Sequence, residues 1–256
     1  MTAMLARLYD RFLHRAGEPE QALLPYVCPR GEIAVDVGAN HGSYTVVLAR
    51  LVDRVVAVEP IPFEVRILRL RFAGAVAAGR VEVVEAALSD ASREVTLMIP
   101  SNSAALASVE AAVASRHHGS AIRVSTRTLD SLGLAPVGFI KIDVEGHEGA
   151  VLRGGMGTVA RDRPTLLIEI EERHHPGGFA EARDLLEPLG YRGWFLMDGR
   201  LRPIAEFDHA RLQNVAALNA EGTGRRENCT YISNFLFVAR TNVHKALRDG
   251  GLLLHD

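Results

Sequence analysis

Short apolar runs rich in valine and isoleucine recur along the middle of the chain. They cover residues 33–37, 55–58, 81–84, 137–142 and 165–170. Runs of this length that are apolar on both faces are typical of strands in a parallel sheet with helices on each side. Between them, apolar residues recur at spacings of three and four, as over 62–78 and 179–189, which indicates helices. The alternation predicts a doubly wound α/β domain.

Other segments interrupt this alternation. Strand-like patterns at 94–99 and 122–126 surround a Ser-, Ala- and His-rich segment at 100–120, which we expect to be a substrate-facing insertion because long loops are often functional. A last strand is predicted over 231–239, and leucine and aromatic residues at helical spacing over 3–15 predict an amphipathic helix. We divide the chain into an N-terminal helical extension, a main domain and a C-terminal tail, at 1–31, 32–240 and 241–256.

The charged residues nearly balance. Lys and Arg number 29 and Asp and Glu number 31, for a net charge of −2. No overall positive field attracts nucleic acid, so we expect a small-molecule partner instead. The two cysteines form no CxxC pair, and no apolar run reaches the roughly 20 residues of a membrane-spanning helix. We expect a cytoplasmic protein without a membrane span, and a homo-oligomer is compatible with this sequence.

A glycine-containing loop follows the first predicted strand and opens a helix. Gly38 permits a tight turn and the close approach of a ligand, and Gly42 allows the start of the helix to pack against the strand. Glu59 follows Gly38 by 21 residues and ends the second strand. A carboxylate at that place accepts hydrogen bonds from ribose hydroxyls. The loop and Glu59 together predict a nucleoside-containing cofactor.

The residues within the loop distinguish between two classes of cofactor. Asn40 stands where a dinucleotide-binding loop needs its middle glycine, and Asp36 places a negative charge beside the loop. Phosphates would be repelled there, whereas a cationic sulfonium or α-amino group would be attracted. The loop therefore favours S-adenosyl-L-methionine over a nicotinamide dinucleotide.

Five segments of the chain occur in a recognisable order and spacing. They are DVGANHGSYT at 36–45, VEP at 58–60, EAALSD at 85–90, IKIDVEGHE at 140–148 and IEIE at 168–171. Together they resemble the FkbM-type S-adenosylmethionine-dependent methyltransferases over about residues 32–172. The resemblance implies a mostly parallel, seven-stranded sheet of the Rossmann-like class I methyltransferase type, with one antiparallel strand near its C-terminal end. It also implies methyl transfer, usually to oxygen.

The same resemblance implies a set of cofactor contacts. The methionine end would be lined by four residues of the loop, the ribose by one acidic residue and the adenine by two polar residues: Asp36, Gly38, Asn40 and Gly42, then Glu59, then Ser89 and Asp90. Judged by the residues alone, Ser89 and Asp90 are polar positions directly after a strand, where an ordinary turn is equally expected.

Candidate groups for the methyl acceptor follow the fourth and fifth long strands. Attack by an aliphatic hydroxyl needs a base, and Asp143 is our first candidate, either as that base or as a group that holds the acceptor or the α-amino group. His147, in the strand-to-helix turn, is a secondary candidate. Glu169 lies in a buried strand and needs a partner, so a structural ion pair with Lys141 is as good an interpretation as catalysis.

Two further histidines raise the question of a metal. His174 and His175 follow the fifth strand and would have to meet Asp143 and Glu169. Adjacent residues on a strand point to opposite faces, so a shared site would require a bent loop. We therefore predict no metal site.

The combined prediction is an O-methyltransferase that uses S-adenosyl-L-methionine and acts on a hydroxyl of a sugar-containing or specialised-metabolite acceptor. One alternative is methylation of nitrogen or a carboxylate on the same fold. A dinucleotide-dependent oxidoreductase is disfavoured by Asn40 and Asp36, and a non-enzymatic nucleoside-binding regulator is disfavoured by the carboxylates and histidines expected at the cleft.

Overall fold

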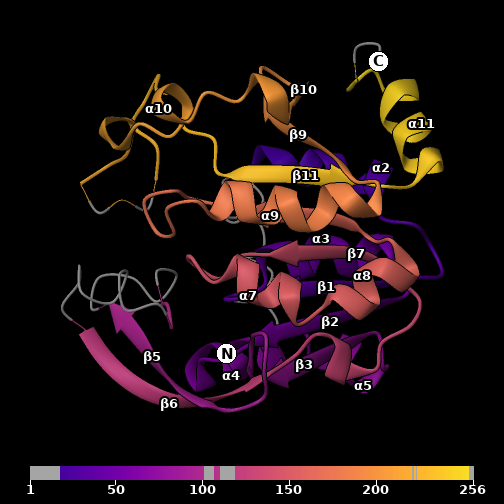
Figure 1. Ribbon diagram of the computed structural model, residues 1–256. Coiled ribbons are helices and arrows are strands. Elements are labelled where there is room, and N and C mark those ends of the chain that lie inside the picture. The colour runs from indigo at the N-terminus through magenta and orange to yellow at the C-terminus, as the bar shows by residue number, and fades with distance from the viewer. Residues whose placement is uncertain (1–17, 101–106, 110–118, 221, 223, 254–256) are drawn as a thin grey trace.

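An eight-stranded sheet forms the centre of the molecule (Figure 1). The computed structural model describes residues 18–100, 107–109, 119–220, 222 and 224–253. Strand order across the sheet is β10-β9-β11-β8-β7-β1-β2-β3. In chain order these strands are β1 (Ile33–Val37), β2 (Arg54–Glu59), β3 (Val81–Glu85), β7 (Val137–Ile142), β8 (Thr165–Glu169), β9 (Arg192–Met197), β10 (Arg200–Pro203) and β11 (Asn234–Val238).

The sheet is mostly parallel, as the apolar runs predicted. Strands β3, β2, β1, β7 and β8 are parallel neighbours, and β11 is antiparallel to both β8 and β9. The eighth strand, β10, was not predicted. It pairs with β9 across a two-residue turn in which Asp198 and Gly199 both have positive φ, 52° and 74°. An Asp-Gly pair is a strong hairpin signal, so the sequence did carry information on this strand.

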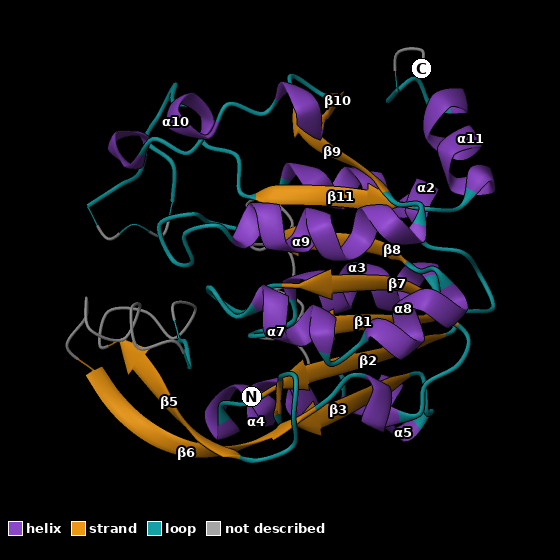
Figure 2. Ribbon diagram, in the orientation of Figure 1, coloured by secondary structure: helices purple, strands orange, loops and turns teal. Residues whose placement is uncertain are grey.

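Helices cover both faces of the sheet, as Figure 2 shows. Their apolar residues form two cores because alternate strand residues point to opposite sides: Val35 packs with one helix layer and Ala34 with the other. The layer on Val35 consists of α7 (Glu148–Arg153), α8 (Met156–Asp162) and α9 (Gly178–Leu186). The layer on Ala34 consists of α2 (Leu24–Val27), α3 (Ser43–Leu51), α4 (Pro62–Arg71), α5 (Ala73–Ala77) and α11 (Thr241–Asp249).

Shorter helical segments complete the chain. Predicted helix 62–78 is divided into α4 and α5 at Phe72, and predicted helix 179–189 ends as a 3-10 turn. Residues 241–249, set apart above as a tail, form α11, whose Val243 and Leu247 are buried. The remaining segments are α10 (His209–Leu212) and 3-10 helices at Pro19–Leu23, Asp130–Leu132, Glu187–Leu189, Ile204–Glu206 and Val215–Ala217. Within the described chain, no helix is long and apolar enough to cross a bilayer.

A second sheet extends away from the main one (Figure 1). Its strands are β4 (Ala87–Leu88), β5 (Glu94–Pro100) and β6 (Gly119–Arg127), in the order β4-β6-β5. The two strands predicted around the 100–120 segment are therefore confirmed, although β6 begins three residues earlier. Most of the segment between them, and the helix predicted at 3–15, lie outside the described residues.

The glycine loop lies where β1 ends and touches the neighbouring strand β7. Gly38 has a φ of 76°, and a Cβ atom there would lie 1.8 Å from the backbone oxygen of Asp143. Gly42 has a φ of 82°, but it packs differently from the prediction. A Cβ on Gly42 would meet the side chains of Leu68 and Phe72 near helix α4, at 2.9 and 2.7 Å, rather than a strand.

We predict that Gly38→Ala destabilises the protein by about 1–3 kcal/mol more than Gly31→Ala does. Both glycines have positive φ, 76° and 81°, so both substitutions carry the backbone strain of a left-handed alanine, while a Cβ on Gly31 meets no atom within 4 Å. The difference, measured by chemical denaturation, isolates the clash with Asp143. Equal losses would show that the loop moves away from β7 without cost.

Candidate active site

The Glu59 carboxylate is held rigidly against the glycine loop. Its Oε2 accepts a hydrogen bond from the backbone N–H of Asn40 at 2.9 Å, and its Oε1 accepts one from the N–H of Ile61 at 2.9 Å. Asn40 has a φ of 47°, a left-handed conformation that asparagine tolerates better than most residues. Burial raises the pKa of Glu59 to about 7, against the opposing effect of the two amides. Glu59 is thus a hydrogen-bond acceptor held in a fixed position beside the glycine loop.

A cavity of about 250 Å³ opens beside this carboxylate. Six of the ten predicted site residues line it, namely Gly38, Asn40, Glu59, Asp143, His147 and Glu169. One part of its wall is apolar, formed by Ile61, Ala87, Leu88 and Leu97. The described part of the 100–120 segment also contributes, because Ser108 lines the cavity and its hydroxyl donates to the backbone oxygen of Glu145 at 2.7 Å.

The other four predicted residues lie outside the cavity lining. Asp36 is buried, and its Oδ2 accepts a hydrogen bond from the hydroxyl of Thr45 at 2.5 Å. Burial raises the pKa of Asp36 to about 6. Gly42 faces helix α4, as described above. Ser89 is buried, with its Oγ 3.0 Å from His147 Nε2, and Asp90 is exposed beside Arg93 and Arg153.

Lys141 connects the two strands that carry the acceptor candidates. Its side chain is 1% exposed, and its Nζ lies 3.6 Å from Asp143 Oδ2 and 3.7 Å from Glu169 Oε2. The ion pair with Glu169 considered from the sequence is therefore confirmed. Burial opposes the charge of Lys141, but the surrounding carboxylates outweigh it and raise the pKa above the ordinary value. The ammonium group is thus charged in the interior at neutral pH.

The same ammonium group links the site to the N-terminal segment. Lys141 Nζ donates to Asn234 Oδ1 at 2.9 Å, and the amide nitrogen of Asn234 donates to Glu18 Oε2 at 3.0 Å. The hydroxyl of Tyr44 donates to the same oxygen at 2.8 Å. Residues 18, 44, 141 and 234 thereby form one polar chain between segments far apart in the sequence.

Glu169, whose side chain is 22% exposed, has a second partner. The hydroxyl of Ser233 donates to its Oε1 at 2.9 Å. Burial raises the pKa of Glu169 well above the ordinary value, with the charge of Asp143 adding to the effect and Lys141 opposing it. At the carboxyl ends of β7 and β8, two carboxylates therefore lie within ion-pair distance of one ammonium group. Both carboxylates line the cavity that the glycine loop also lines.

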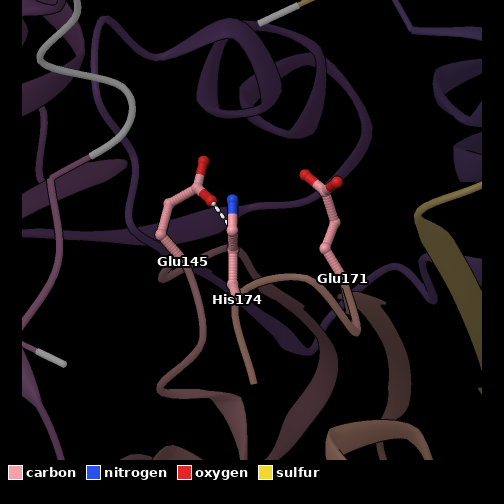
Figure 3. A group of neighbouring side chains, drawn as sticks. All are labelled: Glu145, Glu171 and His174. Carbon is pink, nitrogen blue, oxygen red and sulfur yellow. Dashed lines mark ion pairs between the residues drawn. The ribbon is translucent and has the colours of Figure 1, made fainter. Parts of the chain in front are cut away.

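A third group of side chains consists of Glu145, Glu171 and His174, which lie close to one another (Figure 3). Oxygen and nitrogen atoms of Glu145, Glu171 and His174 lie within 4.8 Å of one another, and His174 Nδ1 is 2.5 Å from Glu145 Oε2. Arg173 donates to both oxygens of Glu171, at 2.6 and 2.8 Å, and Tyr231 donates to one of them. A guanidinium bound to both oxygens disfavours a metal cation there. His175, the other histidine weighed above, instead lies 3.3 Å from Glu181.

Sequence reasoning missed Glu18 and Glu20, which approach the site from the N-terminal segment. Glu18 lines the cavity, and both residues line a second cavity beside it. No local pattern in the sequence signals either contact, since Glu18 and Asn234 are 216 residues apart. Pairing of that kind is determined by the tertiary fold alone.

The fold and the site define a class of protein. The strand order, the glycine loop and the acidic residue at the end of β2 are those of a Rossmann-like, class I methyltransferase. A family model described as the methyltransferase FkbM domain matches residues 36–192, more than half of the chain. The chain therefore belongs to the FkbM family of S-adenosylmethionine-dependent methyltransferases.

A solved structure of similar fold supports this architecture. A methyltransferase FkbM from Methylobacillus flagellatus KT is 17% identical with a TM-score of 0.53, over 89% of this chain and 50% of that one, so this chain spans about half of its length. An O-methyltransferase from Bacillus cereus, solved in complex with SAH, is 16% identical with a TM-score of 0.45, over 91% and 81% of the two chains. A search of curated proteins found no match.

We predict that Lys141→Met destabilises the protein by about 3–5 kcal/mol, because it leaves buried carboxylates without their cation. The chain's other lysine is the control: Lys245 pairs with Asp249 on the surface, and Lys245→Met should cost under about 1 kcal/mol. Adding Glu169→Gln to Lys141→Met should recover part of the loss. Chemical denaturation at pH near 8 measures all three, and similar values for the two lysine variants would show that the buried network contributes little.

Proposed function

We propose that this chain transfers a methyl group from S-adenosyl-L-methionine, bound in the 250 Å³ cavity, to a hydroxyl of a sugar-containing or specialised-metabolite acceptor. The observation that carries the proposal is the placement of Glu59. Its two oxygens are fixed by two backbone amides, beside a loop closed by Gly38 and opposite the carboxylates of β7 and β8. The residue proposed to hold the donor and the carboxylates proposed to act on the acceptor thus line one cavity.

The residues of the cavity suit the parts of this cofactor. Each Glu59 oxygen accepts one backbone hydrogen bond and keeps a lone pair for a ribose hydroxyl. The apolar wall near Ile61 and Leu88 suits the face of a purine. Gly38 and Asn40 would contact the methionine end. We assign Asp36, Gly42, Ser89 and Asp90 supporting roles, because they lie behind the loop or the wall rather than on the cavity surface.

The chemistry assigns a base to the acceptor side. When bound, S-adenosyl-L-methionine supplies a methyl carbon that the acceptor oxygen attacks while the carbon–sulfur bond breaks and its electron pair stays on sulfur. Asp143 takes the hydroxyl proton, because its partly exposed carboxylate lines the cavity and Lys141 stabilises its charge. Glu169, held by Lys141 and by the hydroxyl of Ser233 at the cavity wall, orients the acceptor. His147 is placed by Ser89 on the same wall.

We expect Glu59→Ala to weaken the binding of S-adenosylhomocysteine at least roughly tenfold, because it removes the acceptor of two ribose hydroxyls, and to lower stability by about 1–3 kcal/mol, because the backbone amides of Asn40 and Ile61 lose their acceptor. The matched control is Glu85→Ala. Glu85 ends the neighbouring strand β3, in register with Glu59, and its side chain is exposed beside Arg69. Calorimetry measures both affinities, and an unchanged affinity for Glu59→Ala would refute the ribose assignment.

The raised pKa of Glu59 adds a pH dependence. The folded pKa of about 7 exceeds the ordinary 4.5, so ionising Glu59 costs the unliganded protein stability as the pH rises through 7. Ribose hydroxyls prefer the ionised carboxylate, so affinity for S-adenosylhomocysteine should rise between about pH 6 and about pH 8, with proton release on binding. Glu59→Gln should abolish this dependence. Calorimetry in buffers of different ionisation enthalpy counts the protons.

Asp143→Asn should lower the turnover number by roughly 10²–10⁴-fold while changing the affinity for S-adenosylhomocysteine much less. Asparagine keeps the size of the side chain and removes the base. Asp184→Asn, on the exposed surface of α9, is the control. Turnover is measured with labelled methyl donor and an extract of sugars and metabolites. Equal losses of turnover and cofactor affinity would place Asp143 on the cofactor side instead.

A further inference from the structure

A second cavity of about 190 Å³ adjoins the first. The two share five lining residues, which are Glu18, Glu169, Glu171, Arg173 and Gly222. The shared wall includes Glu169, one of the carboxylates at the proposed transfer site. A molecule in the second cavity could therefore extend one end to the reacting carbon in the first.

The Glu20 carboxylate lines this second cavity and lacks a partner on another residue. Its side chain belongs to the N-terminal 3-10 helix and is only 8% exposed. It accepts a hydrogen bond from its own backbone amide, and no other residue in the described ranges donates one to it. A carboxylate has about four acceptor sites, so Glu20 keeps the capacity to accept donors from a molecule bound in the cavity that it lines.

The other charges around the cavity leave an excess of negative groups. Glu171 is matched by Arg173, and Glu169 by Lys141 and Ser233. Arg173 also donates to the backbone oxygen of Gly222, another lining residue, at 2.9 Å. Neither Glu18 nor Glu20 belongs to these charge pairs, and both residues line the cavity.

One further positive charge, that of Arg225, lies near these two carboxylates, but it does not occupy the interior of the cavity. Arg225 is exposed at the rim. Burial raises the pKa of Glu20 first, the charge of Glu18 adds to this, and Lys141 and Arg225 oppose it only in part. The interior of the cavity is therefore suited to donors and unsuited to anions.

We propose that the second cavity binds the methyl acceptor and that Glu20 selects acceptors presenting hydroxyl or ammonium donors over acceptors carrying a negative charge. This rests on the proposed function, since it names the acceptor class of that same site. Neutral sugar hydroxyls and a protonated amino sugar share this donor chemistry, whereas a phosphorylated or carboxylated sugar would meet Glu18 and Glu20 without a matching cation.

Binding to the full chain, with S-adenosylhomocysteine present, tests this inference. Three glucose derivatives provide probes of different charge: neutral methyl α-glucoside, cationic glucosamine and anionic glucose 6-phosphate. We expect the first two to shift the backbone amide resonances of Glu20, Gly222 and Ser233, and glucose 6-phosphate to leave them unchanged. Shifts of equal size with glucose 6-phosphate would overturn the proposal, and so would the absence of shifts with all three.

The variant Glu20→Gln should weaken glucosamine binding roughly tenfold, because it removes a charge-assisted hydrogen bond. Glu187→Gln, which is exposed at the start of the 3-10 helix that follows α9, is the matched control. If Glu20→Gln does not fold, Arg225→Gln provides the second measurement, since removing this positive charge should strengthen glucosamine binding relative to methyl α-glucoside. An unchanged ratio would count against the proposal.

Failure of this inference can be told apart from failure of the proposed function. Calorimetry with S-adenosylhomocysteine decides the donor site by itself. If the cofactor binds and the second cavity stays unperturbed, the methyltransferase assignment stands and the acceptor subsite is wrong. If the cofactor does not bind, the sugar titrations on the unliganded protein still decide whether the second cavity recognises donors.

Discussion

The burial of the Lys141 ammonium group is the constraint on which the site depends. A charged amine that is 1% exposed needs carboxylates and an amide oxygen around it, and the fold provides these from three strands, with Asp143 on the β7 side, Glu169 on β8 and Asn234 on β11. Each partner is thereby fixed at the same edge of the sheet. Because Asn234 also binds Glu18, this edge determines where the N-terminal segment lies.

A steric constraint complements this electrostatic one. Gly38 lies so close to the backbone oxygen of Asp143 that no side chain fits between them. The loop proposed to hold the methyl donor therefore touches the residue proposed to deprotonate the acceptor. Group transfer requires that two molecules meet within about 3–3.5 Å. The contact between Gly38 and Asp143 keeps the proposed donor and acceptor sites close together without a conformational change.

The sequence was sufficient for the features that depend on local pattern. Apolar runs identified the parallel strands, and the count from Gly38 to Glu59 placed a carboxylate at the end of β2. Long-range packing was out of reach: the orientation of Asp36 toward Thr45, the contact of Gly42 with helix α4 and the approach of Glu20 depend on chain segments that meet only after folding. Strand β10 was different, because Asp198 and Gly199 signalled its hairpin locally.

The two cavities draw many of their residues from different parts of the chain. Glu59 and the glycine loop fall within residues 36–192, the part that matches the family. Much of the second cavity comes from outside that range, from Glu18, Pro19 and Glu20 at one end and from Leu218, Gly222, Gly224, Arg225, Tyr231, Ser233 and Asn234 at the other. A shared domain can thus hold a shared donor while flanking segments determine the acceptor, since function resides in the sites added to a fold. Membership of the family consequently implies S-adenosyl-L-methionine as the methyl donor, and the charges of the flanking segments are the place to look for the acceptor.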